Sequence, residues 1–198
     1  MSKTSRRLAA AAALLVLAGT ASAHTGHGTN SFAMGLAHPL GADHLLAMLA
    51  VGLWSVFALP ARRVWLGPAT FMAVLMASAA LGAAGLTVPF IEQAIAASVV
   101  VFGLMLVATL RGLPAGTGLA LVAVAASLHG LAHGAEAPGT ASFASYAAGF
   151  LLTTAALHFG GVFAGLSLRR GFAEQVPRML AGVGLAFSGA GVYLLSQF

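Results

Sequence analysis

The chain has 198 residues, of which 60% are hydrophobic and only 7% are charged, and its mean hydropathy is +0.97. Soluble proteins carry about 25% charged residues, so this composition excludes an ordinary soluble domain and indicates an all-α membrane protein with several spans. The net charge of +5 comes from scattered basic residues that form no patch, which argues against nucleic-acid binding, and the lack of cysteine excludes disulfides and thiolate metal sites.

The first 23 residues have the pattern of a secretory signal peptide. A positively charged start precedes a short apolar run (Leu8–Gly19), and Ala21-Ser22-Ala23 then provides a small-x-small cleavage site. The apolar run is shorter than the ~20 residues that a membrane span needs. We therefore expect residues 1–23 to be removed and the mature chain to begin at His24. The alternative is an uncleaved signal anchor.

We predict that residues 24–198 form one transmembrane domain with six spans. Each long apolar segment has close to the ~20 residues that cross ~30 Å of hydrocarbon as a helix. We predict spans at Pro39–Leu59, Trp65–Leu86, Phe90–Leu110, Gly118–Ala135, Phe143–Leu166 and Met179–Ser196.

The basic residues of the mature chain fall in alternate loops between these segments. They are Arg62, Arg63, Arg111, Arg169, Arg170 and Arg178. The intervening connections and the mature amino-terminal tail contain no Lys or Arg. The positive-inside rule then places both mature termini outside the cell membrane, in agreement with a cleaved signal peptide.

Polar residues open the first predicted span. His38 precedes Pro39, which suits the first turn of a helix, and Asp43 and His44 follow about one turn deeper. An ionisable side chain near the bilayer centre costs ~2.5–3.5 kcal/mol on insertion scales, so such residues usually mark a pathway or a site. The short apolar stretch before His38 cannot span a membrane and is expected to lie at the interface or to re-enter.

A second polar group ends the fourth predicted span. His129, His133 and Glu136 are spaced i, i+4 and i+7, which places them on one face of a helix. Glu136 and His133 are predicted to reach the depth of the first polar group, with His129 ~10 Å deeper at 1.5 Å per residue. His158 in the fifth span lies deeper still. We expect these residues to form a series of polar positions across the membrane.

Imidazole and carboxylate ligands suit borderline divalent ions such as Ni²⁺, Co²⁺ or Zn²⁺. We therefore predict an intramembrane pathway for a divalent metal ion. Two alternatives remain open at this stage. The acidic residues could simply pair with histidines to hold the bundle together, and His158 could be a helix–helix hydrogen-bonding residue.

The two motifs resemble those of a known family. His38–Gly52 is similar to the signature of the HupE/UreJ family of bacterial nickel transporters, His129–Glu136 resembles its second motif, and Leu157–Gly160 resembles its fifth-span histidine. The resemblance covers essentially the whole mature chain. It implies an inner-membrane permease, not an enzyme, that imports Ni²⁺ or in some relatives Co²⁺ for hydrogenase or urease maturation proteins, with no permanently bound cofactor. By the same resemblance the functional residues are His38, Asp43, His44, His129, His133 and Glu136.

Two other functions compete with a metal permease. A membrane haem or metal redox protein could use paired histidines, but axial histidines need no carboxylates beside them. An intramembrane hydrolase is disfavoured because the chain lacks His-Glu-x-x-His and a convincing Ser–His pair. The chain also lacks a phosphate-binding Gly-Lys-Ser/Thr loop, which argues against nucleotide hydrolysis.

Overall fold

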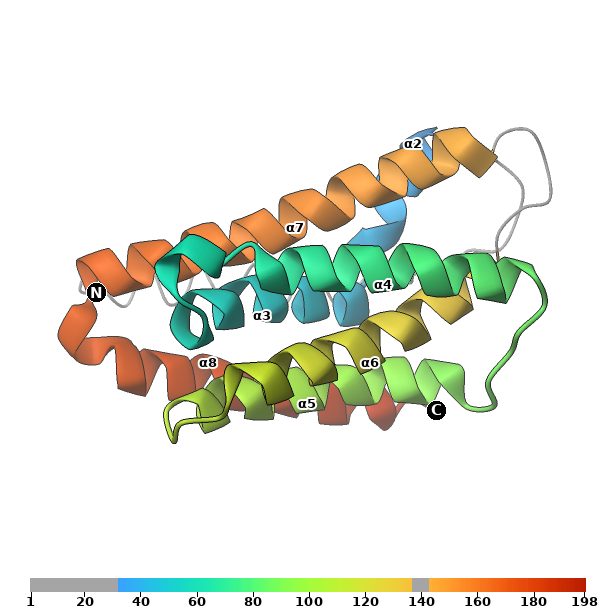
Figure 1. The fold of residues 1–198 in the computed structure, drawn as a ribbon. Coiled ribbons are helices and arrows are strands. Elements are labelled where there is room, and N and C mark those ends of the chain that lie inside the picture. Colours follow the sequence, from blue (N-terminus) through green and yellow to red (C-terminus); the bar gives the residue numbers. More distant parts are fainter. Residues whose placement is uncertain (1–31, 137–142) are drawn as a thin grey trace.

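The computed structural model describes residues 32–136 and 143–198, and every regular element in these two ranges is helical (Figure 1). The predicted signal peptide and the tail after it lie outside the described residues. The α-helices are α2 (Phe32–Ala37), α3 (Ala42–Ala58), α4 (Leu66–Ala83), α5 (Ile91–Thr109), α6 (Ala115–Ala135), α7 (Phe143–Gly171) and α8 (Val176–Leu195). Short 3₁₀ turns are η1 (His38–Leu40), η2 (Ala61–Arg63) and η3 (Ala173–Gln175).

The helices form a multi-pass membrane bundle. Five helices are long and apolar enough to cross a membrane, and α2–η1 with α3 makes a sixth candidate that is bent by 75°. The predicted all-α membrane bundle is therefore confirmed, with five to six spans in the described chain. Helix α7 extends five residues beyond the predicted Leu166, and Arg169 on this extension donates a hydrogen bond to the Val56 carbonyl (3.3 Å) near the end of α3.

The first span differs from the prediction because it does not start at Pro39. Pro39 lies inside the 3₁₀ turn η1, and the α-helix proper starts at Ala42. Gly41 lies between the 3₁₀ turn and the α-helix with an extended backbone (φ −54°, ψ 143°). It is the C-cap of η1 and the N-cap of α3. The short stretch before His38, expected to lie at the interface or re-enter, is the helix α2 that this break turns away from α3.

Glycines set how closely the helices approach. The most extensive packing joins α4 with α6, α5 with α8, and α3 with α7. A Cβ atom on Gly134 of α6 would collide with the Ala79 carbonyl of α4, and one on Gly161 of α7 would collide with the Leu49 carbonyl of α3. These contacts leave no room for a side chain, so the backbones of each pair lie in direct contact.

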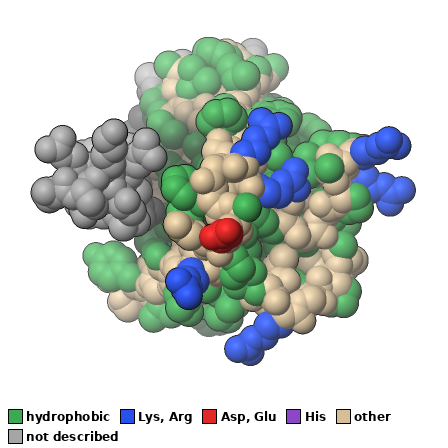
Figure 2. Space-filling view, turned by 90° about the vertical axis from the view of Figure 1, so that its left-hand side faces the viewer, with side chains coloured by type: hydrophobic (Ala, Val, Ile, Leu, Met, Phe, Trp, Pro, Cys, Tyr) green, Lys and Arg blue, Asp and Glu red, His purple; other side chains and the backbone are tan. Residues whose placement is uncertain are grey.

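All of the described arginines lie at one end of the bundle, as the sequence predicts. Helix α3 ends there and α4 begins, and the α5–α6 and α7–α8 connections lie beside them (Figure 1). Figure 2 views this end and shows the basic side chains spread around it, with acidic surface among them. The start of α3 and the end of α6, where the two polar motifs lie, are at the opposite end.

Replacing Gly103 with alanine should destabilise the bundle. Its new Cβ would meet the Gly184 carbonyl and the Ser188 hydroxyl of α8, and overpacking of this kind costs about 1–3 kcal/mol. Thermal unfolding of the purified protein in detergent should therefore occur at a lower temperature. Gly182→Ala is the matched control, because a Cβ there meets nothing within 4 Å. Equal melting temperatures for the two variants would contradict this account of the packing.

Candidate metal site

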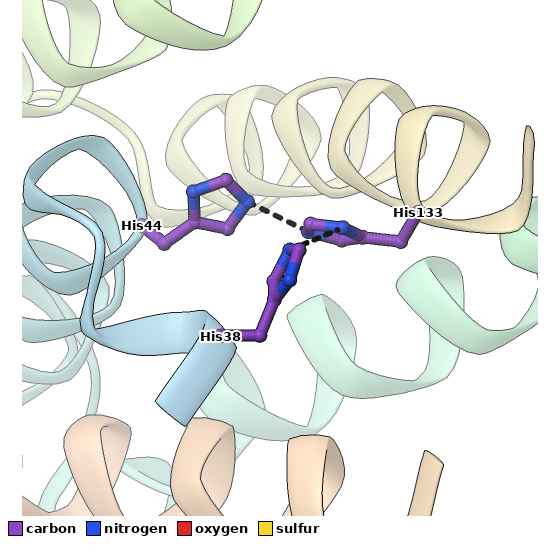
Figure 3. Close-up of side chains that lie close together, drawn as sticks. All are labelled: His38, His44 and His133. Atoms are coloured by element: carbon purple, nitrogen blue, oxygen red, sulfur yellow. Dashed lines mark hydrogen bonds between the residues drawn. The ribbon is translucent and has the colours of Figure 1, made fainter. Parts of the chain in front are cut away.

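Three histidines from three separate elements converge (Figure 3), near the end of the bundle opposite the described arginines. His38 lies in η1, His44 in the first turn of α3, and His133 in the last turn of α6. His44 is 2% exposed, and the other two are half-buried. One ring nitrogen from each lies within 4.8 Å of the others, which is a grouping that could hold a metal ion. We call these residues the histidine triad.

The nitrogen separations in the triad are those of potential co-ligands. His44 Nε2 lies 2.6 Å from His133 Nε2, and His133 Nδ1 lies 3.1 Å from His38 Nε2. Two neighbouring nitrogen ligands at about 2.0–2.1 Å from one ion lie ~3 Å apart. His133 uses a different nitrogen for each of these two contacts, so its ring or that of a neighbour must turn before one nitrogen of each histidine faces a common ion.

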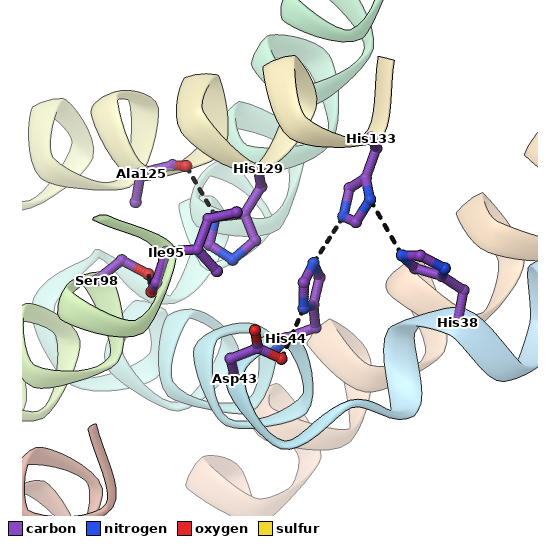
Figure 4. Close-up of polar contacts among 8 residues, drawn as sticks. All are labelled: His38, Asp43, His44, Ile95, Ser98, Ala125, His129 and His133. Atoms are coloured by element: carbon purple, nitrogen blue, oxygen red, sulfur yellow. Dashed lines mark hydrogen bonds and ion pairs between the residues drawn. The ribbon is translucent and has the colours of Figure 1, made fainter. Parts of the chain in front are cut away.

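Asp43 orients the triad through His44. Its Oδ1 accepts hydrogen bonds from the His44 backbone N–H and from His44 Nδ1, each at 2.8 Å (Figure 4). A carboxylate accepts only, so Nδ1 of His44 carries a proton, and in the neutral ring Nε2 presents its lone pair to His133. This carboxylate–histidine arrangement is the one that usually fixes the tautomer of metal-binding histidines.

The proton on His44 sets the direction of the other contacts. Nε2 of neutral His44 can only accept, so His133 Nε2 donates to it and His133 Nδ1 accepts from His38 Nε2. A metal ion that binds these nitrogens must displace the protons between them. Metal binding at the triad is therefore coupled to proton movement.

The break at Gly41 and the docking of α2 hold His38 in place. Gly35 of α2 lies against the Tyr146 carbonyl of α7, and Gly149 of α7 lies against the Phe32 carbonyl of α2. The Thr153 hydroxyl also donates to the Leu36 carbonyl at 2.9 Å. Helix α2 is thereby fixed on α7, and the 3₁₀ turn that follows carries the His38 ring toward His133.

Aromatic rings and an apolar cavity border the triad on the side of α7. Phe150 lies 4.7 Å from the His133 ring centre and 5.8 Å from that of His38, and Tyr146 lies 5.9 Å from His38. An apolar cavity of about 260 Å³ between α4, α6 and α7 reaches His133. Apolar walls cannot replace the water around an ion, so this side of the site is a poor route for one.

His129 and His158 continue inward from the triad. The His129 ring centre lies 4.9 Å from that of His44, so His129 adjoins the triad rather than forming a separate level ~10 Å deeper. The reason is that the His44 ring extends into the bundle toward α6 (Figure 4). His158 on α7 is fully buried, and the Phe71 ring of α4 contacts both histidines, with its centre 5.4 Å from that of His129 and 4.9 Å from that of His158.

Glu136 lies at the other end of the series. It caps the carboxyl end of α6, one residue after the last helical position and three after His133, and its side chain is exposed. The structure thus brings His38, His44 and His133 together, places Asp43 and His129 against His44, and leaves Glu136 and His158 toward opposite ends.

Sequence reasoning missed Phe71, Tyr146 and Phe150, because nothing in their spacing distinguishes them from other apolar residues of the spans.

Comparison with known proteins gives one family and one curated relative. The family model described as "HupE / UreJ protein" matches residues 12–194. The protein named "Protein HupE" from Rhizobium leguminosarum bv. viciae is 39% identical over 180 residues, which is 90% of this chain and 92% of the relative. No solved structure matches the chain.

Replacing Asp43 with asparagine should weaken metal binding without unfolding the bundle. An amide can rotate its NH₂ group toward His44 and allow the wrong tautomer, and loss of such an orienting partner typically costs 10–100-fold in affinity. The measurement is equilibrium binding of Ni²⁺ to purified protein. The control is Glu174→Gln, which alters an exposed carboxylate in η3 at the arginine-rich end. Equal affinity in both variants would show that Asp43 does not orient a metal ligand.

Proposed function

The chain belongs to the HupE/UreJ family, and on that premise we propose that it is an inner-membrane permease that imports a divalent transition-metal ion. We take Ni²⁺ as the first candidate cargo and Co²⁺ as the second. The observation that carries the proposal is the histidine triad, three imidazoles gathered near one end of an apolar helical bundle.

The chemistry of the triad supports a transition-metal ion over Mg²⁺ or Ca²⁺. Imidazole nitrogen suits Ni²⁺, Co²⁺ and Zn²⁺, whereas the harder ions prefer sets of oxygen ligands. An ion entering the bundle must give up bound water, and the three converging nitrogens can replace part of that shell. The chain contains no cysteine, so no thiolate competes for a softer ion.

The other polar residues take roles that follow from their positions. Exposed Glu136 attracts the cation at the mouth, Asp43 orients His44, and His129 receives the ion on the inner side of the triad. His158 extends the route into the bundle. The residues that we propose for the metal site and its pathway are therefore His38, Asp43, His44, His129, His133, Glu136 and His158. Transport needs no resident cofactor and no catalytic residue in this scheme.

The arginine-rich end is proposed to face the cytoplasm. Cytoplasmic loops of membrane proteins carry an excess of Lys and Arg. With the arginine-rich end in the cytoplasm, the triad lies toward the outside, where an imported ion arrives. Both mature termini are then external, and removal of residues 1–23 is part of the same proposal. In a bacterial inner membrane this orientation delivers the ion to the cytoplasm, where hydrogenase or urease maturation proteins are the proposed recipients.

A haem redox function fits the geometry less well. Two axial histidines must lie on opposite faces of the haem iron, with the porphyrin plane between their rings. The His44 and His133 nitrogens are only 2.6 Å apart, and His38 lies against the same His133 ring. This spacing suits a single small ion and leaves no room for a porphyrin between the rings.

Variants of the two motifs should lose uptake while remaining in the membrane. Asp43→Ala, His44→Ala, His133→Ala and Glu136→Ala should each nearly abolish uptake of radioactive Ni²⁺ by cells, because each removes a ligand, its orienting partner or the charge at the mouth. His158→Ala should have an intermediate effect. His27→Ala, in the tail before the first span, is the histidine control. Competition with Co²⁺ in the same assay tests the choice of cargo.

The competing structural interpretation predicts a different outcome. If Asp43 and Glu136 serve only to hold the bundle together, uptake should fall only in proportion to the amount of protein in the membrane. Well-inserted Asp43→Ala and His44→Ala variants with full uptake would refute the permease pathway.

The orientation has its own measurement. A reporter that is active only outside the cytoplasm should be active when fused after Phe198, and inactive when fused within the Arg111–Gly112 turn. The reverse pattern would place the triad on the cytoplasmic side and overturn the proposed direction of import.

A further inference from the structure

Beyond the triad, two buried histidines share one hydrogen-bonding arrangement. His129 Nδ1 donates to the Ala125 carbonyl of its own helix at 2.9 Å, and His158 Nδ1 donates to the Thr154 carbonyl of its own helix at 2.8 Å. A carbonyl oxygen can only accept, so each Nδ1 carries the proton of the neutral ring. Both rings are thereby fixed in the tautomer whose Nε2 lone pair is available, which is the form that binds metals.

These two lone pairs are buried without a protein partner. Both histidines are 0% exposed, and among the residues that the structure describes neither Nε2 has a hydrogen-bond partner. The Thr154 hydroxyl, also 0% exposed, lacks one as well. A buried polar atom left unpaired costs about 1–3 kcal/mol, so three of them in one region call for an explanation.

Their placement is continuous with the triad. The His129 ring adjoins that of His44, and Phe71 contacts both His129 and His158. Thr154 and His158 lie one turn apart on α7 and so share a face of that helix. The His158 carbonyl also lies against Gly52 of α3, which holds this part of α7 close to α3.

We propose that His158 Nε2 and the Thr154 hydroxyl form a second, inner position for a divalent cation, which receives the ion from His129 past the ring of Phe71. This deepens the permease function and rests on it. The ion moves from the triad to His129 and then to the α7 position, and each step exchanges one imidazole for another. Phe71 contacts both of the last two imidazoles, so its ring is the apolar surface that the ion passes in this transfer.

The absence of cysteine makes the inner position directly testable. Thr154→Cys is a nearly isosteric change that places one thiol beside His158 in a chain with no other thiol. A thiolate that binds Cd²⁺ gives an ultraviolet charge-transfer band, so binding is observed at that position alone. We expect purified Thr154→Cys protein to show a saturable band at one Cd²⁺ per chain. Adding His158→Ala should weaken that binding at least about tenfold, because it removes a ligand.

The matched control is Ser188→Cys, a buried hydroxyl on α8 that donates to the Val100 carbonyl of α5. It should give no band at the same Cd²⁺ concentrations. The inner position is refuted if Thr154→Cys gives no band, if His158→Ala leaves the affinity unchanged, or if Ser188→Cys gives an equal band. Uptake of Ni²⁺ and of Co²⁺ by the wild type separates the two proposals: a Cd²⁺ band without uptake of either ion refutes the permease alone, and uptake without the band refutes the inner position alone.

Discussion

The contact between His44 Nε2 and His133 Nε2, at 2.6 Å, is the interaction on which the site depends. It joins the start of α3 to the end of α6, two helices that pack little against each other directly. Each is instead held by another partner: α6 lies against α4, and α3 lies against α7, through glycines at the contact points. The histidines therefore occupy the space between two tightly packed helix pairs. Side chains, rather than backbone contacts, bridge this space, so an ion can enter there without separating either pair.

The polar side chains in this space differ in how many of their hydrogen-bonding atoms have partners. Those of the triad pair with one another and with Asp43, so in the absence of metal their hydrogen bonds offset much of the cost of burial. Deeper in the bundle, His129 and His158 each make one bond to their own helix and present the second nitrogen to the interior. A neutral imidazole costs less to bury than a charged side chain, which is why histidine can occupy these positions while the acidic residues stay near the mouth. In the proposed pathway this arrangement favours passage over trapping, because no single position formed by the described residues gathers enough ligands to saturate a transition-metal ion.

Most of the fold and about half of the site could be predicted from the sequence. Hydropathy and the alternate arginine loops predict the membrane bundle and the shared end of its basic residues, because both depend on composition over ~20 residues rather than on packing. The i, i+4 spacing of His129 and His133 predicts a common face, since helical geometry alone decides it. The break at Gly41 was not predicted, because Pro39 suits a helix start equally well. The contact of Phe71 with two histidines depends on how α4 packs against α6 and α7, and nothing local in the sequence encodes that.

The break at Gly41 decides whether His38 can belong to the site. On a continuous helix, residues six apart point about 120° away from each other and lie about 9 Å apart along the axis. His38 and His44 would then face different neighbours, and His133 could contact only one of them. The 75° bend turns η1 so that both rings reach His133 from different sides, 4.7 Å and 4.6 Å from its centre. Irregular backbone at membrane depth is tolerated where it lies against protein or lines a cavity, and here α7 covers it. The break is therefore what brings three histidines of the two motifs together, where regular helices would bring together only two.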